Sequence, residues 1–174
     1  MKAELIYISK WFLRVLWVIL LFALIYIKVM GITRCMVKGQ SMYPTLEENE
    51  HLLISKKKKP ERFDLLVFNK DDDVLIKRVI GLPGDEIVVT DGVIVINGKK
   101  IDEPYIDSSL NKEFRDSSFY VKVANDAYYV LGDNRDHSVD SRTFGQINKN
   151  QIIGVPLCRL NLKKGLEKKD EVNS

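Results

Sequence analysis

The stretch EIVVTDGVIVIN, from Glu86 to Asn97, is the clearest guide to the fold of this 174-residue chain. Two runs rich in β-branched residues enclose Asp91-Gly92, and a two-residue hairpin turn needs positive φ at both central positions. Because Asp and Gly tolerate that conformation, the two runs are predicted to pair as antiparallel strands. Asn97-Gly98 follows at once and predicts a second turn of the same kind.

Short apolar runs bounded by turn-forming residues recur on both sides of this hairpin. They are HLLIS from His51, DLLVF from Asp64, VLIKRVIGL from Val74, FYVKV from Phe119, AYYVL from Ala127 and QIIGVPLCRL from Gln151. Asn125-Asp126 lies between two of them and predicts a third hairpin. No long amphipathic helix interrupts the series, so we predict a mainly β fold, an antiparallel sheet or barrel-like domain at 35–162.

An apolar segment from Trp11 to Met30 precedes this β region, and basic residues surround it. Residues 1–34 carry five basic and one acidic side chain, a net charge of +4, which leaves −1 for the remainder of a chain whose net charge is +3. A basic excess around an apolar segment fits a membrane surface better than a nucleic acid. We therefore predict a lipid bilayer as a partner and no nucleic-acid partner.

The uncharged part of that segment, Val15 to Ile27, spans only about 20 Å at about 1.5 Å per residue, less than the ~30 Å of a bilayer core. Arg14 and Lys28 would have to extend to the headgroups so that about 20 residues contribute. No small-x-small cleavage site follows closely, so a retained single-pass helix at 11–32 is predicted rather than a cleaved signal peptide. Residues 1–10 would then be cytoplasmic, although basic residues on both flanks leave the orientation open.

Two polar segments show no periodic pattern of apolar residues. Residues 102–118 (DEPYIDSSLNKEFRDSS) predict a long surface excursion or lid. The charged tail at 163–174 predicts a frayed or disordered end.

Few side chains are suited to metal binding or to histidine-assisted catalysis. Cys35 and Cys158, the only cysteines, lack metal-ligand spacing, so no metal and no cofactor is predicted. His51 begins an apolar strand, where a structural role is the default. His137 lies in the polar stretch GDNRDHSVDSRTFG and stays open as a candidate base.

Lysine is the other candidate base. In VLIKRVIGL, Lys77 shares one face with Leu75 and Val79, whereas Arg78 lies on the opposite face. Apolar burial disfavours a charged amine, whereas arginine does not lose its proton, so of the two only Lys77 could be a base and Arg78 should pair with a carboxylate. Lowering a lysine pKa from ~10.4 to ~8 costs about 3 kcal/mol, which a domain stable by ~5–15 kcal/mol tolerates. The alternative is a lysine extending to solvent from a half-exposed strand.

The candidate nucleophile lies in GQSMYPTL, from Gly39 to Leu46. Gly39 has no side chain and lets a substrate backbone come close, and Pro44 stiffens the segment after Ser41. A loop serine alone carries little weight. With a candidate buried lysine 36 residues later, it forms a hypothesis of a serine activated by an amine.

The segments QSMYPTL, RFDLLVF, IKRVIGLPGD and GDNRDHSVDSRTFG occur in the order and with the spacing seen in type I signal peptidases, also called leader peptidases. Over roughly Val37 to Gly154 the chain resembles the Gram-positive-type members of this Ser/Lys peptidase family. The resemblance implies a β-rich catalytic domain outside the cytoplasm, held to the cell membrane by an amino-terminal helix. Its implied substrates are exported preproteins, cut after the small-x-small ends of their signal peptides.

The matching motif positions imply a role for each site residue. Ser41 corresponds to the nucleophile, Lys77 to the general base, and Ser138 to the hydroxyl that orients the lysine. Structural support is implied at Asp64, Asp133, Asn134, Arg135, Asp136, Asp140 and Arg142. Substrate-binding positions are implied at Val37, Gly39, Met42, Leu46 and Ile76. Met42 is also expected to rest in the bilayer interface.

The chain departs from part of the family at Gly39, where some members have a serine whose hydroxyl donates to the oxyanion. The backbone N–H of Ser41 must then supply much of the stabilisation. A lost oxyanion donor costs ~3 to 4 kcal/mol elsewhere, so a second donor is expected. Asparagine is common in the family where His137 stands, and no mechanism is attached to that change.

Three alternatives stand beside this resemblance. A repressor-type self-cleaving Ser/Lys peptidase shares the chemistry but carries a DNA-binding amino terminus where this chain has an apolar segment. A serine hydrolase that uses His137 is a second enzyme. The third is an inactive membrane-anchored binding or scaffold module of the same fold, and intact Ser41, Lys77 and Ser138 argue against it.

Overall fold

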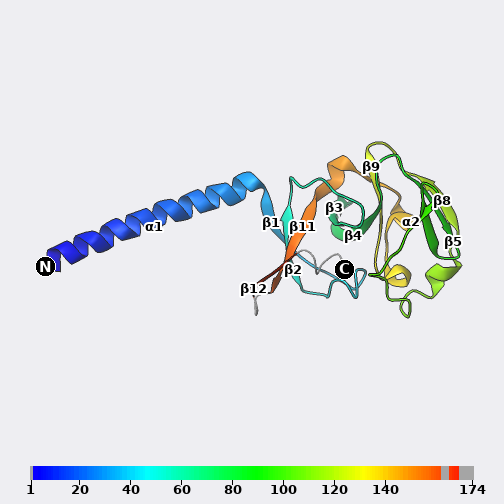
Figure 1. Ribbon diagram of the computed structural model, residues 1–174, viewed down its shortest axis with the longest axis horizontal. Helices are drawn as coiled ribbons and strands as arrows, with labels where there is room; N and C mark the ends of the chain where they lie inside the picture. Colours follow the sequence, from blue (N-terminus) through cyan, green and yellow to red (C-terminus); the bar gives the residue numbers. More distant parts are fainter. Residues whose placement is uncertain (1, 162–164, 169–174) are drawn as a thin grey trace. The chain divides into compact units, whose positions relative to one another are not determined.

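The computed structural model describes the backbone of residues 2–161 and 165–168, and the chain divides into two compact units that meet between Ile32 and Thr33 (Figure 1). The first unit is essentially helix α1 (Lys2–Met30). Its apolar run contains no Gly or Pro, so nothing breaks the helix before Gly31. Gly31 has a φ of +67°, and its N–H donates to the carbonyl of Lys28, which ends the helix in the usual left-handed glycine cap.

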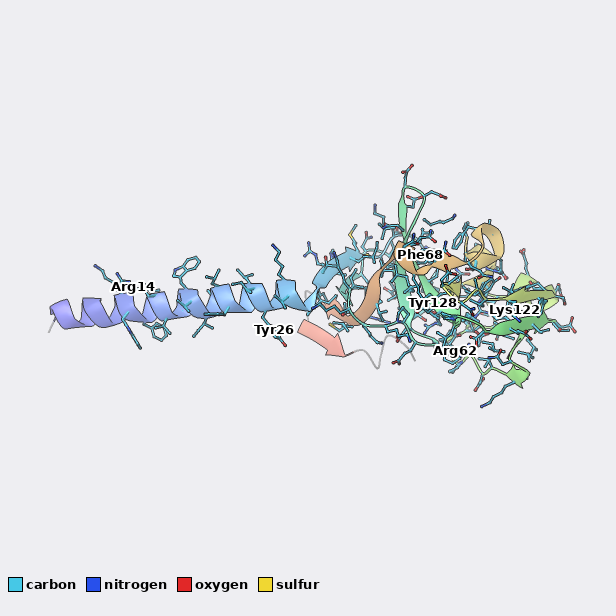
Figure 2. All side chains as sticks on the ribbon, turned by 90° about the horizontal axis from the view of Figure 1, so that it is seen from above. Arg14, Tyr26, Arg62, Phe68, Lys122 and Tyr128 are labelled. Atoms are coloured by element: carbon cyan, nitrogen blue, oxygen red, sulfur yellow. The ribbon has the colours of Figure 1, made fainter. Side chains whose placement is uncertain are left out.

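Most of the large apolar side chains described on α1 are exposed, from Trp11 at 60% to Tyr26 at 63%. Arg14 and Tyr26 project from the helix in Figure 2. Within the part of the chain that the structure describes, no helix is both long enough and apolar enough to cross a membrane. The anchor expected at 11–32 therefore stays a prediction.

The second unit contains two sheets whose resolved registers are all antiparallel, as the sequence predicted for a mainly β fold. Among the described residues the larger sheet has the order β1 (Ile32–Met36), β2 (His51–Ser55), β11 (Ile152–Asn161), β3 (Leu65–Lys70), β4 (Asp73–Gly81), β9 (Ala127–Leu131) and β10 (Ile147–Asn148), with β12 (Gly165–Lys168) paired to β11. The smaller sheet has the order β7 (Lys99–Lys100), β6 (Val93–Ile96), β5 (Glu86–Thr90) and β8 (Phe119–Lys122). The short helices are η1 (Glu113–Asp116), η2 (Arg135–His137), α2 (Ser141–Phe144) and η3 (Lys149–Gln151).

The two predicted turns around β6 are confirmed. Asp91 and Gly92 have φ of +48° and +72°, and β5 pairs with β6 across them. Asn97 and Gly98 have φ of +52° and +79°, and β6 pairs with β7. Positive φ at both central positions is the geometry that Asp-Gly and Asn-Gly predicted.

The third predicted hairpin is wrong. β8 pairs with β5 in the smaller sheet, whereas β9 pairs with β4 and β10 in the larger one, so the Asn125-Asp126 turn connects two sheets. The burial patterns give the reason. β8 alternates between half-buried and exposed residues, as in a sheet with one face in solvent, whereas every residue of β9 is buried.

The polar segment at 102–118 is not a simple surface excursion, because it is packed onto the domain. Tyr105, Asn111 and Phe114 are all buried. The tail prediction also fails in part, since residues 165–168 form β12 and pair with β11. The rest of the tail lies outside the described residues.

Strand β4 determines what lies at the centre of the domain. It pairs with β3 on one side and β9 on the other, and from Ile76 to Gly81 it is buried on both faces. Lys77 and Arg78 are adjacent on this strand and therefore point to opposite faces. Both are buried for that reason.

Candidate active site

Ser41 begins a tight turn that is fastened to the core by the apolar residues after it. Within the segment Gly39–Leu46, here named the Ser41 turn, the N–H of Leu46 donates to the carbonyl of Met42 at 2.8 Å. Met42 and Leu46 are 2% and 0% exposed, in one apolar cluster with Val37 and Ile76. Burial of Met42 corrects the expectation that this side chain rests in a bilayer interface.

Lys77 reaches the Ser41 turn from β4. Its Nζ lies 2.5 Å from Ser41 Oγ, and the lysine is 3% exposed. A lysine extended into solvent does not fit that burial. The structure thus brings together the two side chains that the sequence proposed as nucleophile and base.

The surroundings of Lys77 make its amine unusually acidic. Loss of hydration on burial lowers the pKa of Lys77 to about 8 from 10.5; nearby Asp140 and Asp133 act in the opposite direction, and Arg142 adds to the lowering. Desolvation disfavours a charged amine, and carboxylates favour it. A substantial neutral fraction is therefore present near pH 8, and a neutral amine can accept the proton of a hydroxyl.

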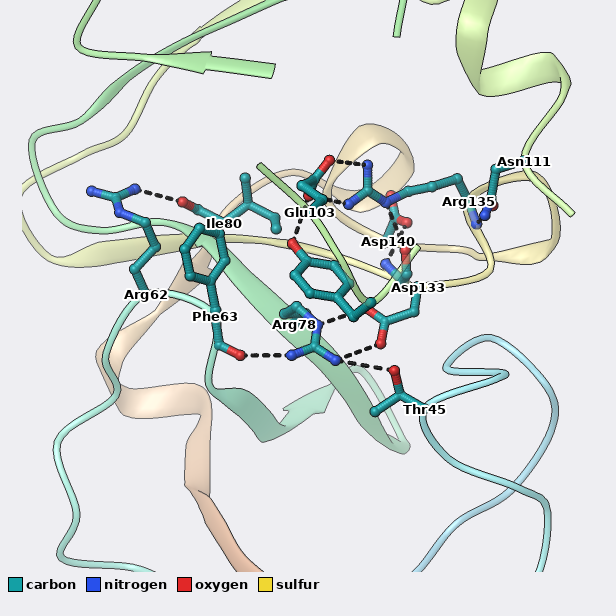
Figure 3. A network of polar contacts seen from close by, with 12 residues as sticks. Thr45, Arg62, Phe63, Arg78, Ile80, Glu103, Asn111, Asp133, Arg135 and Asp140 are labelled. Atoms are coloured by element: carbon teal, nitrogen blue, oxygen red, sulfur yellow. Dashed lines mark hydrogen bonds and ion pairs between the residues drawn. The ribbon is translucent and has the colours of Figure 1, made fainter. Parts of the chain in front are cut away.

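Arg78 lies on the opposite face of β4 and is paired with a carboxylate, as expected. Its Nε and Nη2 donate to the two carboxylate oxygens of Asp133 at 2.8 and 2.6 Å, and both side chains are 0% exposed. Nη1 donates to the carbonyl of Phe63 at 2.9 Å, and Nη2 also donates to Thr45 Oγ1 at 3.1 Å (Figure 3). A guanidinium with these partners is held in one orientation.

The turn after β9, residues 132–135, is hydrogen-bonded to the backbone of the Ser41 turn. The N–H of Asn134 donates to the carbonyl of Ser41 at 3.1 Å, and its Nδ2 donates to the carbonyl of Gln40 at 3.3 Å. Asp140 accepts from the N–H of Gly132 at 3.0 Å, and Arg135 Nε donates to the carbonyl of Gly132 at 2.9 Å. The expected support residues therefore fix the backbone on which Ser41 rests.

Arg142 and Asp136 complete this support. Arg142 donates through Nε and Nη2 to Asp140, at 2.8 Å each, and through Nη2 to the carbonyl of Arg135 at 2.5 Å. Asp136 accepts from two backbone N–H groups of η1. Asp64, farther away, pairs with Lys58 at 2.7 Å.

An outer layer of the site was missed by the sequence analysis. The Tyr105 ring covers the Arg78 guanidinium at 3.8 Å from its carbon, and the Tyr105 hydroxyl donates to Glu103 at 2.6 Å. Glu103 in turn pairs with Arg135 at 2.5 Å, and the N–H of Arg135 donates to Asn111 (Figure 3). Glu103, Tyr105 and Asn111 come from the segment at 102–118, which has no periodic pattern of apolar residues, so periodicity could not identify them. Tyr105 beside Pro104 was the only local signal there.

Comparison with known proteins places this geometry in a family. A family model described as "Signal peptidase, peptidase S26" matches residues 8–160. The chain belongs to the S26 signal peptidase family. A probable signal peptidase I-2 from Synechocystis sp. is 41% identical over 135 residues, which is 71% of this chain and 60% of that protein. Signal peptidase I S from Bacillus subtilis is 40% identical over 130 residues, covering 68% of this chain and 71% of that protein.

A crystal structure of a signal peptidase I from Enterococcus faecalis matches with a TM-score of 0.52 at 34% identity, covering 56% of this chain and 97% of that one. These similarities favour neither a repressor-type self-cleaving peptidase nor an inactive scaffold.

Ser138 is the residue that the sequence analysis expected to orient Lys77. Its Oγ is buried, and among the described residues it has no hydrogen-bond partner. Gly132 lies against it, so closely that a Cβ there would come 2.2 Å from Ser138 Oγ and 2.6 Å from the carbonyl oxygen of Ser41. Only glycine fits between the two serines, and the lysine-orienting role of Ser138 stays a prediction.

The side of the site expected to meet the substrate includes Gly39 and the backbone of Ser41. Gly39 has a φ of +73°, and a Cβ there would meet nothing within 4 Å, so its surface is open. Within the described chain the N–H of Ser41 donates no backbone hydrogen bond, and its role toward an oxyanion stays a prediction. The expected second oxyanion donor also stays a prediction. Val37, Leu46 and Ile76 belong to one buried apolar cluster.

The remaining candidates are not brought to the dyad of Ser41 and Lys77. His137 is exposed on η2, and the hydrogen-bond partner of Ser41 Oγ is Lys77 rather than an imidazole. His51 Nδ1 is buried in β2. Over the described residues, no group of three or more His, Cys, Asp or Glu side chains could hold a metal ion.

Proposed function

We propose that this chain is a signal peptidase I, a serine endopeptidase that removes signal peptides from exported preproteins. One observation carries the proposal: a buried amine with a pKa of about 8 lies 2.5 Å from the hydroxyl of Ser41. Family membership supplies the substrate class, because the similar proteins are themselves named signal peptidases.

In the proposed mechanism Ser41 is the nucleophile and Lys77 the general base. Neutral Lys77 takes the proton of Ser41 as Oγ bonds to the scissile carbonyl carbon, and the carbonyl oxygen becomes an oxyanion facing the N–H of Ser41. The ammonium then gives its proton to the leaving amine as the C–N bond breaks, which leaves an acyl-enzyme. Neutral Lys77 next takes a proton from a water molecule as that water attacks the ester carbon. The C–Oγ bond then breaks, and the Lys77 ammonium returns the proton to Ser41 Oγ.

The substrate is proposed to lie extended beside Gly39–Ser41 and β4, pairing through backbone hydrogen bonds. The open surface at Gly39 supports this placement. Val37, Leu46 and Ile76 are proposed to close the site beneath the residue at the cleavage position, and Met42 to support that wall. Their close burial in one cluster supports selection for small side chains.

Anchoring in the cell membrane is proposed for residues 11–32, with residues 1–10 cytoplasmic, the peptidase domain at 35–162 extracytoplasmic, and 163–174 as its tail. Exposed apolar side chains on several sides of α1 support this, because such a helix is stable only where its surroundings are apolar. In a cell fractionation, the full chain should stay in the membrane pellet after alkaline carbonate washing. Release of the wild-type chain by carbonate would contradict the anchor, whereas a variant with Leu20→Arg and Leu24→Arg should be released.

The pH dependence of cleavage tests the proposed base. With a pKa of about 8, kcat/KM should rise about tenfold per pH unit below pH 8 and level off above it, because only the neutral amine can take the Ser41 proton. The measurement is cleavage of a preprotein by detergent-solubilised enzyme between pH 6 and pH 10. A rising limb centred near pH 6.5 would point to histidine instead and would contradict the proposal.

A further inference from the structure

Thr45 accepts hydrogen bonds from two arginines that lie on different strands. It is 6% exposed, at the end of the Ser41 turn. Its hydroxyl accepts from Nη2 of Arg78 on β4 at 3.1 Å, and its carbonyl oxygen accepts from Nη2 of Arg159 on β11. No role in the reaction has so far been given to this residue.

The Arg78 contact joins the nucleophile's turn to the strand that carries the base. Arg78 follows Lys77 directly, and its guanidinium is fixed by Asp133, by the carbonyl of Phe63 and by the ring of Tyr105. A hydroxyl bonded to so constrained a group is itself held in place. The side chain of Thr45 therefore fastens the Ser41 turn to β4 one residue away from the base.

Ser41 and Thr45 lie in one turn that backbone hydrogen bonds close. The N–H of Leu46 donates to the carbonyl of Met42 at 2.8 Å, and that of Tyr43 donates to the carbonyl of Gln40 at 3.1 Å. A shift at Thr45 is thus passed to Ser41. Displacement of a reacting group by about 1 Å can reduce a rate about 10²-fold, so the link has consequences for catalysis.

We propose that the Thr45 hydroxyl is a positioning group of the reaction, which holds Ser41 Oγ against Lys77 Nζ through its hydrogen bond with Arg78. The proposal rests on the proposed function, because it assigns Thr45 to the same dyad. Thr45 does not touch the reacting atoms. Its backbone contact with Arg159 does not depend on the hydroxyl, so the side chain can be tested alone.

The test compares Thr45→Val, which keeps the shape and removes the acceptor, with Thr45→Ser, which keeps the acceptor. At a temperature well below every variant's melting temperature, Thr45→Val should lower kcat about 10- to 100-fold with KM changed less than about twofold. Thr45→Ser should stay within about threefold of wild type. The matched control is Thr90→Val on β5, where an exposed hydroxyl is removed and no change is expected.

A second measurement does not need a substrate. A loosened turn admits water to Lys77, which relieves the desolvation that lowers its pKa, so the titration of Lys77 followed by NMR should move upward from about 8 in Thr45→Val but not in Thr45→Ser. Unchanged kcat and an unchanged titration in Thr45→Val, or equal defects in both variants, would overturn the proposal. If wild-type enzyme cleaves no preprotein, the proposed function fails, and the Lys77 titration alone decides for or against Thr45.

Discussion

Lys77→Met is expected to abolish preprotein cleavage, by about 10³-fold or more, while the domain stays folded. Methionine has a similar length and suits the dry site, but it cannot take the Ser41 proton. Ser41→Ala should show a loss of similar size, and the double variant should lose little more because the two residues act as one unit. The measurement is turnover of a preprotein by detergent-solubilised enzyme, with circular dichroism to verify folding.

His137→Ala is the matched control for this pair. The imidazole is exposed on η2 and is not the partner of Ser41 Oγ, so activity should stay within about threefold of wild type. If Lys77→Met kept its activity while His137→Ala lost it, the assignment of the base would be wrong.

The unfolding free energy of Lys77→Met should depend on pH differently from that of wild type. The sign of this difference follows from the direction in which the Lys77 pKa is shifted. Because the folded pKa is about 8 and the ordinary value is 10.5, the unfolded chain binds more protons between these pH values, and wild-type stability rises with pH across that window. A shift of this size corresponds to about 3 kcal/mol. The variant has no titrating amine at this position. The unfolding free energy of wild type minus that of the variant should therefore rise by about 3 kcal/mol between pH 8 and 10.5 and stay constant below pH 8.

Local patterns were enough to predict much of the fold. The turn at Asp91-Gly92 and the strands on either side follow from which residues tolerate positive φ and from β-branched runs. Such rules act over a few residues. The partition of β8 and β9 into different sheets depends instead on packing between distant segments, which a local turn signal at Asn125-Asp126 does not encode.

The site divides in the same way. Ser41 and Lys77 could be found because their chemistry restricts the residue types and the motif order is informative, although 36 residues separate them. Tyr105 and Thr45 could not be found by periodicity. Their importance comes from contacts with the buried Arg78, and a tyrosine or threonine in a loop looks the same whether or not it meets such a group.

Asp133→Asn is expected to destabilise the domain by about 3 to 5 kcal/mol, because it leaves the guanidinium of Arg78 charged and buried without its counter-ion. Both side chains are 0% exposed, so no solvent can replace the carboxylate. Asparagine has nearly the same shape as aspartate, so the loss of unfolding free energy measures the removal of the charge rather than the creation of a cavity. Chemical denaturation at pH 7 measures the change. The matched control is Glu86→Gln, which breaks an ion pair with Lys122 of 3.0 Å whose members are 50% and 66% exposed, and which should change stability by less than about 1 kcal/mol.

The same substitution should also move the pH dependence of cleavage. The Asp133 carboxylate favours the charged form of Lys77, so its removal should lower the pKa of Lys77 below about 8 and shift the rising limb of kcat/KM toward lower pH. A purely structural role would reduce the folded fraction without moving that limb. An unchanged limb together with the full loss of stability would show that Asp133 supports the fold without influencing the base. Unchanged stability would contradict the inference that Asp133 compensates the buried charge of Arg78.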